Sequence, residues 1–261
     1  LDAQSVQVTL ARIPFVSLEG KVFPFESSEP QSFQEKIKRA NRAIQISSLR
    51  KIQHFSEKCV CPSVCMEKER AELDKLTILA GQDQVKMILL IGETGTGKEV
   101  YARYFHLNST RSSKDMMFLN CSSFDQTLLR SEFFGYDKNA FTGAGHAGSD
   151  GLLATAHRGI IFMDEISKTQ PSFQQIFLHF LQNGKFRKIG GKKEEYADVR
   201  LLFGLNQDPQ EWLQSGNVLP DFWNRINIHK IRIFPLRERK AIIPELSAAF
   251  ILEFNQSYQK K

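Results

Sequence analysis

One stretch of the chain has the residue types and the spacing of a phosphate-binding loop. Residues 92–99 read Gly-Glu-Thr-Gly-Thr-Gly-Lys-Glu, directly after the apolar run Val85–Ile91. Glycines let successive backbone N–H groups turn toward a phosphate, and a helix that begins at the loop adds the positive end of its dipole. Lys98 can then reach the β- and γ-phosphates of a nucleotide. We therefore expect a nucleotide site formed by Gly92, Glu93, Thr94, Gly95, Thr96, Gly97, Lys98 and Glu99.

Two adjacent carboxylates supply a second half for such a site. Asp164 and Glu165 follow the apolar residues 160–163. The carboxyl end of a buried parallel strand lies at the same sheet edge as a phosphate loop. We expect Asp164 to hold Mg²⁺ through its water shell and Glu165 to orient and deprotonate the attacking water. An acidic strand end that caps the next helix is the alternative interpretation, which the accompanying phosphate loop disfavours.

Strands alternating with helices are expected to position these groups from about Cys61 onward. The expected strands are Val85–Ile91, Met117–Asn120, Ile160–Asp164, Arg200–Phe203 and Lys230–Phe234, and helices are expected to begin near Lys98, Gln126 and Pro171, with a last helix over Ile242–Tyr258. Each strand is short and rich in aliphatic residues or Phe, which is typical of strands buried on both faces. The pattern predicts an α/β fold with a five-stranded parallel sheet between helices.

Composition limits the class of protein. Apolar residues make up 41% and charged residues 25% of 261 residues, which excludes a disordered chain. No apolar run approaches the roughly 18 residues of a membrane span. Lysine plus arginine minus acidic residues is 35 − 29 = +6, a mild excess that is compatible with nucleic acid, nucleotides or an acidic partner. Four cysteines without a signal-peptide pattern favour reduced thiols and a cytoplasmic protein.

A third stretch identifies a family. Residues 135–144 read Gly-Tyr-Asp-Lys-Asn-Ala-Phe-Thr-Gly-Ala. This resembles the GAFTGA loop of the sigma-54-dependent transcriptional activators, the NtrC-like branch of the AAA+ ATPases. The family's phosphate loop also has Glu after the lysine, Leu178–Gly191 is similar to its helix and second substrate loop, and Pro235–Arg239 matches its PLRER segment. The resemblance covers about Cys61 to the end of the chain.

The resemblance implies a function and a division of the chain. It implies an ATP- and Mg²⁺-dependent ATPase that remodels sigma-54 RNA polymerase, assembles into a ring (a hexamer in most members), and reaches promoter or enhancer DNA through a domain absent from this chain. Residues 1–60, which we interpret as a hairpin followed by a helix, would be a regulatory or connector segment. Residues 61–240 would be the ATPase core, and 241–261 the truncated start of a helical lid.

The resemblance also implies roles for single residues. Phe141 and Thr142 would contact the sigma factor, Asn120 would hold Glu165 until the target is engaged, and Asn206 would be a nucleotide sensor. Arg225 matches one of the two finger arginines that reach across the subunit interface to the neighbouring nucleotide.

Two departures from the family pattern keep alternatives open. Leu219 stands where the second finger arginine is expected, and Asn139 replaces the first Gly of the loop. A slow enzyme is one consequence of losing one finger arginine. A module that binds nucleotide with weak or no hydrolysis is the alternative function, and an AAA+ remodeller of another target is a third.

Overall fold

The computed structural model describes residues 67–138, 140, 148–244, 246–248, 250 and 251. These residues belong to one unit of the chain, which spans residues 51–261. The expected hairpin and helix of residues 1–60 lie outside the described residues, as do Asn139, Phe141 and Thr142. Among the described residues, no helix is long and apolar enough to span a membrane.

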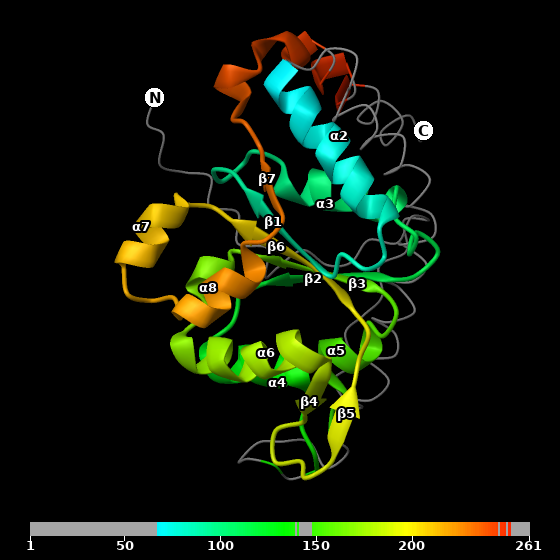
Figure 1. Cartoon of the computed structure of the whole chain (residues 1–261), viewed down its shortest axis with the longest axis vertical. Helices are drawn as coiled ribbons and strands as arrows, with labels where there is room; N and C mark the ends of the chain where they lie inside the picture. Colours follow the sequence, from blue (N-terminus) through cyan, green and yellow to red (C-terminus); the bar gives the residue numbers. More distant parts are fainter. Residues whose placement is uncertain (1–66, 139, 141–147, 245, 249, 252–261) are drawn as a thin grey trace, which may run out of the picture. The chain divides into compact units, whose positions relative to one another are not determined.

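A five-stranded parallel sheet forms the centre of the described part (Figure 1). Its strands, in the order β2-β3-β6-β1-β7, are β2 (Met116–Asn120), β3 (Ile160–Asp164), β6 (Arg200–Leu205), β1 (Met87–Ile91) and β7 (Lys230–Arg232). All four strand pairs are parallel. All five expected strands are confirmed, with bounds that differ by up to two residues.

Helices cover both faces of this sheet. In Figure 1, α2 (Glu67–Gly81) and α3 (Lys98–Leu107) lie on one side of the strands, while α4 (Gln126–Phe134), α5 (Gly151–Thr155) and α6 (Pro171–Asn183) lie on the other. The expected helix starts at Lys98, Gln126 and Pro171 are confirmed. The Asp125 side chain caps α4 by accepting from the N–H groups of residues 127 and 128, and a proline opens α6.

Alternate strand residues enter two separate cores. Leu89, Ile161 and Phe203 pack with the phenylalanines of α4, α6 and α8 (Pro220–Ile226), whereas Ile88 and Phe162 pack with apolar residues of α2 and α3. This alternation follows from the two-residue period of a strand, which sends successive side chains to opposite faces. The run of buried strand residues, which is typical of a sheet covered on both sides, therefore serves both cores.

Smaller elements complete the described part. A short antiparallel hairpin of β4 (Lys185–Arg187) and β5 (Glu194–Tyr196) follows α6, and α7 (Pro209–Gln214) follows β6. One-turn 3-10 helices are η2 (Ile166–Lys168), η3 (Leu236–Glu238) and η4 (Lys240–Ile242). The expected last helix begins after η4 and is helical through residue 251 at the described positions, and its remaining residues lie outside them.

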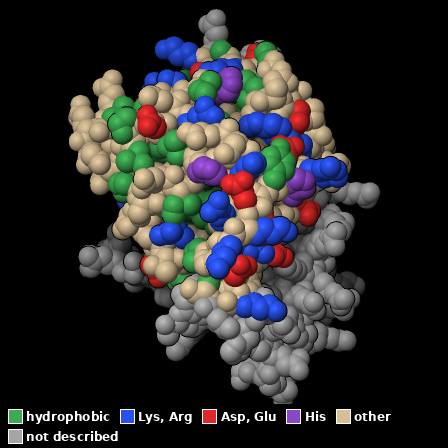
Figure 2. All heavy atoms as spheres, turned by 60° about the horizontal axis from the view of Figure 1, so that its bottom comes forward, with side chains coloured by type: hydrophobic (Ala, Val, Ile, Leu, Met, Phe, Trp, Pro, Cys, Tyr) green, Lys and Arg blue, Asp and Glu red, His purple; other side chains and the backbone are tan. Residues whose placement is uncertain are grey.

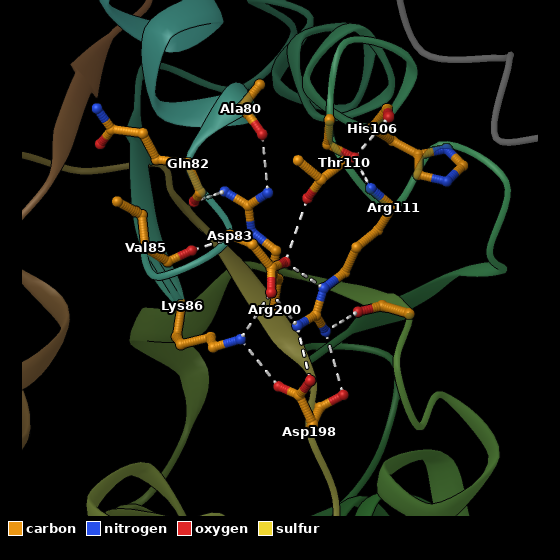
Figure 3. A network of polar contacts seen from close by, with 12 residues as sticks. Ala80, Gln82, Asp83, Val85, Lys86, His106, Thr110, Arg111, Asp198 and Arg200 are labelled. Atoms are coloured by element: carbon orange, nitrogen blue, oxygen red, sulfur yellow. Dashed lines mark hydrogen bonds and ion pairs between the residues drawn. The ribbon is translucent and has the colours of Figure 1, made fainter.

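Two buried arginines join elements under the amino ends of the strands (Figure 3). Arg200, the first residue of β6, donates to the carbonyls at the end of α2 and in the turn before β1: those of Leu79, Ala80, Gln82 and Val85. Arg111 pairs with Asp83 (Nε–Oδ1 2.7 Å) and Asp198 (Nη2–Oδ2 2.8 Å). Arg200 therefore supplies donors to carbonyls that a helix end leaves unpaired.

Candidate functional site

The phosphate loop connects β1 directly to α3, as the sequence predicts. Gly95 and Gly97 have φ values of 81° and 89°, which lie in the left-handed region that favours glycine. Among the described residues, no hydrogen bond is donated by the backbone N–H groups of Glu93, Thr94, Gly95, Gly97 and Lys98. A row of unbonded N–H groups at a helix N-terminus can bind an anion.

Lys98 places a buried positive charge on this loop. Its side chain is buried, and its Nζ donates to the Gly92 carbonyl at 2.9 Å and the Glu93 carbonyl at 3.0 Å. Burial lowers the pKa of Lys98, and the carboxylates of Asp164 and Glu165 offset part of that shift. A phosphate would offer the ammonium group anionic oxygens in place of neutral carbonyls, and such charge-assisted hydrogen bonds are stronger.

Asp164 ends β3 at the same edge of the sheet. Burial raises the pKa of its carboxyl, against the hydrogen bond from the Glu165 N–H (2.9 Å) and the charge of Lys98. A Cβ atom added to Gly204 of the neighbouring strand β6 would lie 2.2 Å from Asp164 Oδ1. Gly204 therefore makes room for this carboxylate. Gly204 is not among the site residues expected from the sequence, although a glycine inside a buried strand signals a close approach.

Glu165 occupies a strained backbone position. Its φ of 54° places a non-glycine residue in the left-handed region, directly after β3 and before η2. Such conformations cost free energy and are concentrated at functional sites. The strain is consistent with the role expected for Glu165 in activating water.

The two asparagines also lie at this edge. Asn120 is in register with Asp164, but its Oδ1 accepts from the N–H and the hydroxyl of Ser122 at 2.9 and 2.8 Å. No hydrogen bond from Asn120 to Glu165 is present among the described residues, so that contact stays a prediction. Asn206 follows β6, and its buried Oδ1 has no partner in the described part. An unpaired buried polar atom is unusual and is compatible with a sensor that meets a ligand.

The arginine positions lie on α8, which packs on α6. Arg225 donates from Nη2 to the Leu181 carbonyl at 3.4 Å, while its buried Nε has no partner among the described residues. Leu219 directly precedes α8, packs against the core, and donates its N–H to Gln174 Oε1 at 2.9 Å. In this structure Leu219 is therefore a packing residue, and the role of Arg225 as a finger stays a prediction.

The segment that matches PLRER contacts the phosphate loop through two arginines. Arg237 forms a bidentate ion pair with Glu93, in which Nη1 lies 2.7 Å from Oε2 and Nη2 bonds to Oε1. The buried Arg239 donates to the Thr96 carbonyl at 2.8 Å and to Glu69 Oε1 at 3.0 Å. The PLRER match indicates this segment, but no local pattern in the sequence predicts the contacts of Glu69 and Arg239.

The two ends of the GAFTGA-like loop meet the β4–β5 hairpin. Tyr136 forms bridges to Ser149 and to Ile189, and Lys188 Nζ lies 2.6 Å from Asp150 Oδ1. Figure 2 shows basic and acidic side chains interspersed on the molecular face that this view brings forward. The basic residues of the hairpin are partly paired with its own acidic residues, for example Lys185 with Glu194. We therefore assign no DNA-binding patch to this hairpin.

Comparison with known proteins identifies relatives of the described fold. The family model described as the Sigma-54 interaction domain matches residues 65–232. The Nif-specific regulatory protein of Rhizobium meliloti is 39% identical over 184 residues, which cover 70% of this chain and 34% of that protein. The transcriptional regulatory protein XylR of Pseudomonas putida is 39% identical over 174 residues, which cover 67% of this chain and 31% of that protein. The chain spans about a third of the length of these relatives.

A solved structure supports the same fold. The crystal structure of NtrX from Brucella abortus matches with a TM-score of 0.68 at 23% identity, over 91% of this chain and 51% of NtrX. NtrX has also been crystallised in complex with ADP and with ATP. Together with the family match, the parallel sheet and the phosphate loop show that this chain belongs to the sigma-54 interaction domain family, the AAA+ domain of sigma-54-dependent transcriptional activators.

Proposed function

We propose that this domain hydrolyses ATP and uses the reaction to remodel sigma-54 RNA polymerase. The observation that carries the proposal is the meeting of three features at one sheet edge. These are the row of unbonded N–H groups in the phosphate loop, the buried ammonium group of Lys98, and the carboxylates of Asp164 and Glu165. The NtrX complexes with ADP and ATP add support, since NtrX shares the fold.

Asp164 fits a magnesium ion. Its carboxyl is partly buried, its pKa is raised by burial, and the absence of a side chain at Gly204 makes room for its Oδ1 atom. A divalent cation would stabilise the ionised form that burial disfavours. When bound, Mg²⁺ supplies charge neutralisation for the phosphates. Asp164 would hold the ion, with Glu99 in the position usually occupied by a Ser or Thr ligand.

Glu165 would orient and deprotonate the attacking water. Its place directly after β3 puts it beside Asp164, and its φ of 54° turns the chain sharply at this point. Asn120 ends the neighbouring strand β2. Its Oδ1 atom accepts from Ser122, so in this structure Asn120 does not hold Glu165. A switch of Asn120 between Ser122 and Glu165 would couple nucleotide state to the loop that holds Phe141 and Thr142.

A ring, a hexamer in most members of the family, would complete the site. Arg225 would act on the nucleotide of a neighbouring subunit, because a head-to-tail interface can complete each site only after assembly. The division into residues 1–60, 61–240 and 241–261 belongs to this proposal, as does a DNA-binding domain outside the chain.

A second function is favoured by one observation. Leu219 packs against the core where the family has its other finger arginine. The charge that develops on the transferring phosphoryl group would therefore be stabilised by one arginine instead of two. A finger arginine is worth about 10³–10⁵ in rate where it has been measured. A domain that binds nucleotide with weak or no hydrolysis is therefore the alternative.

Steady-state ATPase activity as a function of protein concentration separates these functions. The leading proposal expects ATPase activity per subunit to rise with concentration as rings close, and a mixture of Arg225→Ala with Glu165→Ala to recover some turnover. The alternative expects ATP binding without turnover at any concentration. Binding of sigma-54 in the presence of ADP and aluminium fluoride tests the target, and its absence would point to another partner.

A further inference from the structure

A buried arginine, Arg239, donates a hydrogen bond to the backbone of the phosphate loop. Arg239 is 8% exposed, and its Nη2 donates to the carbonyl of Thr96 at 2.8 Å. Among the described residues, this is the only hydrogen bond that the Thr96 carbonyl accepts. The bond joins the segment that follows β7 to the centre of the loop, across 143 positions of the chain.

This bond sets the direction of a phosphate-facing group. The described part of the chain contains no cis peptide bond, and in a trans peptide the C=O and the following N–H point in opposite directions. With its carbonyl oxygen on Arg239, the peptide between Thr96 and Gly97 therefore directs the Gly97 N–H away from Arg239. That N–H donates no hydrogen bond among the described residues and belongs to the row of donors in the loop.

The Thr96 N–H and hydroxyl bond to the Glu93 carbonyl, and the Gly97 carbonyl accepts from residues 100 and 101. The Thr96 carbonyl and the Gly97 N–H, which form the peptide between them, have no other hydrogen bond among the described residues. Gly97 has a φ of 89°, and a Cβ atom added there would meet nothing closer than 3.9 Å. Glycine visits many backbone conformations, so a loose peptide before it can rotate and turn its N–H out of the phosphate cradle. The hydrogen bond from Arg239 opposes that rotation.

The neighbours of Arg239 suit an orienting role better than a stabilising one. Its Nη1 bonds to Glu69 Oε1 at 3.0 Å, and Tyr101 donates to the same oxygen at 2.9 Å. Yet Glu69 Oε2 and Arg239 Nε are buried without a hydrogen-bond partner in the described part. A buried ion pair with unsatisfied atoms contributes little net stability. The planar guanidinium bonds to two acceptors through two nitrogen atoms in a fixed geometry, whereas the donors of a lysine all lie on one freely rotating atom.

We propose that Arg239 is a positioning residue for phosphate binding, which acts by holding the Thr96–Gly97 peptide with its N–H toward the bound phosphates, while Glu69 orients Arg239. The proposal rests on the proposed function, because it assumes that the loop binds ATP. It adds a residue outside the phosphate loop and the Asp164–Glu165 pair to the nucleotide site.

The affinities of Arg239→Lys for ATP and ADP, measured by calorimetry, test the proposal. Lysine keeps a positive charge beside Glu69, but its single Nζ atom replaces the two separate Nη atoms that bond to Glu69 and to the Thr96 carbonyl. We expect both affinities to fall about tenfold, because the phosphate cradle is common to the two nucleotides. Glu69→Gln keeps Arg239 and an acceptor for it, so its loss should stay within about threefold.

Arg111→Lys is the matched control. Arg111 is also a buried arginine bonded to carboxylates and carbonyls, but it lies at the opposite edge of the sheet. This variant should lower the melting temperature and leave nucleotide affinity within about twofold. If Arg239→Lys does not fold, the pair Glu69→Gln with Arg239→Met replaces it, and the same tenfold loss is expected.

Two results would overturn the proposal: unchanged affinity in a folded Arg239 variant, or an equal loss in Glu69→Gln and Arg239→Lys, which would indicate a structural ion pair. In both cases the wild-type protein still binds ATP and loses that binding on Lys98→Ala. Failure of the proposed function would give a different result, because the wild-type protein itself would then bind no ATP. The role proposed for Arg239 would in that case be wrong as well.

Discussion

The buried polar groups at the amino ends of the strands are paired, whereas several at the carboxyl ends are not. At the amino edge, Arg200 donates to four carbonyls and Arg111 to two carboxylates and two carbonyls (Figure 3). At the carboxyl edge, Asn206 Oδ1 and the Nε of Arg239, whose Nη2 bonds to the phosphate loop, are buried without a partner among the described residues. The two edges differ because one stabilises the fold and the other keeps its polar groups available for a ligand.

The carboxylates of the two edges differ in the same sense. Hydrogen bonds from Arg111 hold the pKa of Asp83 well below its usual value, and they do the same for the pKa of Asp198 against the opposing effect of burial. Burial raises the pKa of Asp164. Ionised aspartates therefore stabilise the fold at the amino edge, while the ionised Asp164 destabilises it. Substitutions at the two edges should change different properties of the protein.

The largest effect is expected for Glu165→Gln on turnover. The side chain keeps its size and loses its basicity, so ATP hydrolysis should fall about 10³-fold. ATP affinity should stay within about threefold, because the carboxylate acts on water and not on the bound phosphates. Single-turnover hydrolysis and calorimetric titration measure the two quantities. Surviving turnover would place the general base elsewhere.

Arg200→Met should have the largest effect on stability. It leaves the carbonyls at the end of α2 without their buried donor, and we expect the free energy of unfolding to fall by about 3 kcal/mol. Denaturant unfolding measures the loss, and the ATP affinity of the folded fraction should not change. A loss below about 1 kcal/mol would mean that other donors replace the guanidinium.

Asp164→Asn should stabilise the fold while it removes activity. It takes away a carboxylate whose ionisation burial disfavours and keeps an oxygen that can accept from the Glu165 N–H. We expect unfolding to cost about 1 kcal/mol more than in the wild type, and Mg²⁺-dependent hydrolysis to be lost. Asp83→Asn at the amino edge should instead destabilise the protein. If both variants changed stability in the same direction, the contrast between the edges would be wrong.

The smallest effect is expected in the dependence of stability on acid pH. The folded-state pKa of Asp83 is depressed, so its contribution is present above its unfolded-state value of 3.8 and is lost as the pH falls below it. Asp83 is half exposed, and the slope should be only about half a kcal/mol per pH unit as the pH falls from about 4 to about 2. Urea unfolding of the wild type and Asp83→Asn measures it. Equal slopes would contradict the prediction.

Local patterns in the sequence predicted the parts of the site that depend on neighbouring residues. An apolar run, a set of glycines and the start of a helix define the phosphate loop within residues 85–98, since backbone freedom and helix initiation are local properties. The ends of β3 and β2 were predicted in the same way. Asp164 and Asn120, the last residues of these strands, therefore lie at the carboxyl edge of the sheet, as expected. The order of these elements was enough to predict the α/β class.

Tertiary structure alone decided which distant residues serve that site. Arg239 reaches Thr96 across 143 positions and Arg200 reaches Leu79 across 121, and neither pairing leaves a signal in the local sequence. Gly204 adjoins Asp164 only because β3 and β6 pair in one register. The short hairpin and helices α7 and α8 also depend on packing, because elements of three to seven residues are too short to be stable alone. The sequence thus determined the phosphate loop, and the fold determined what holds it in shape.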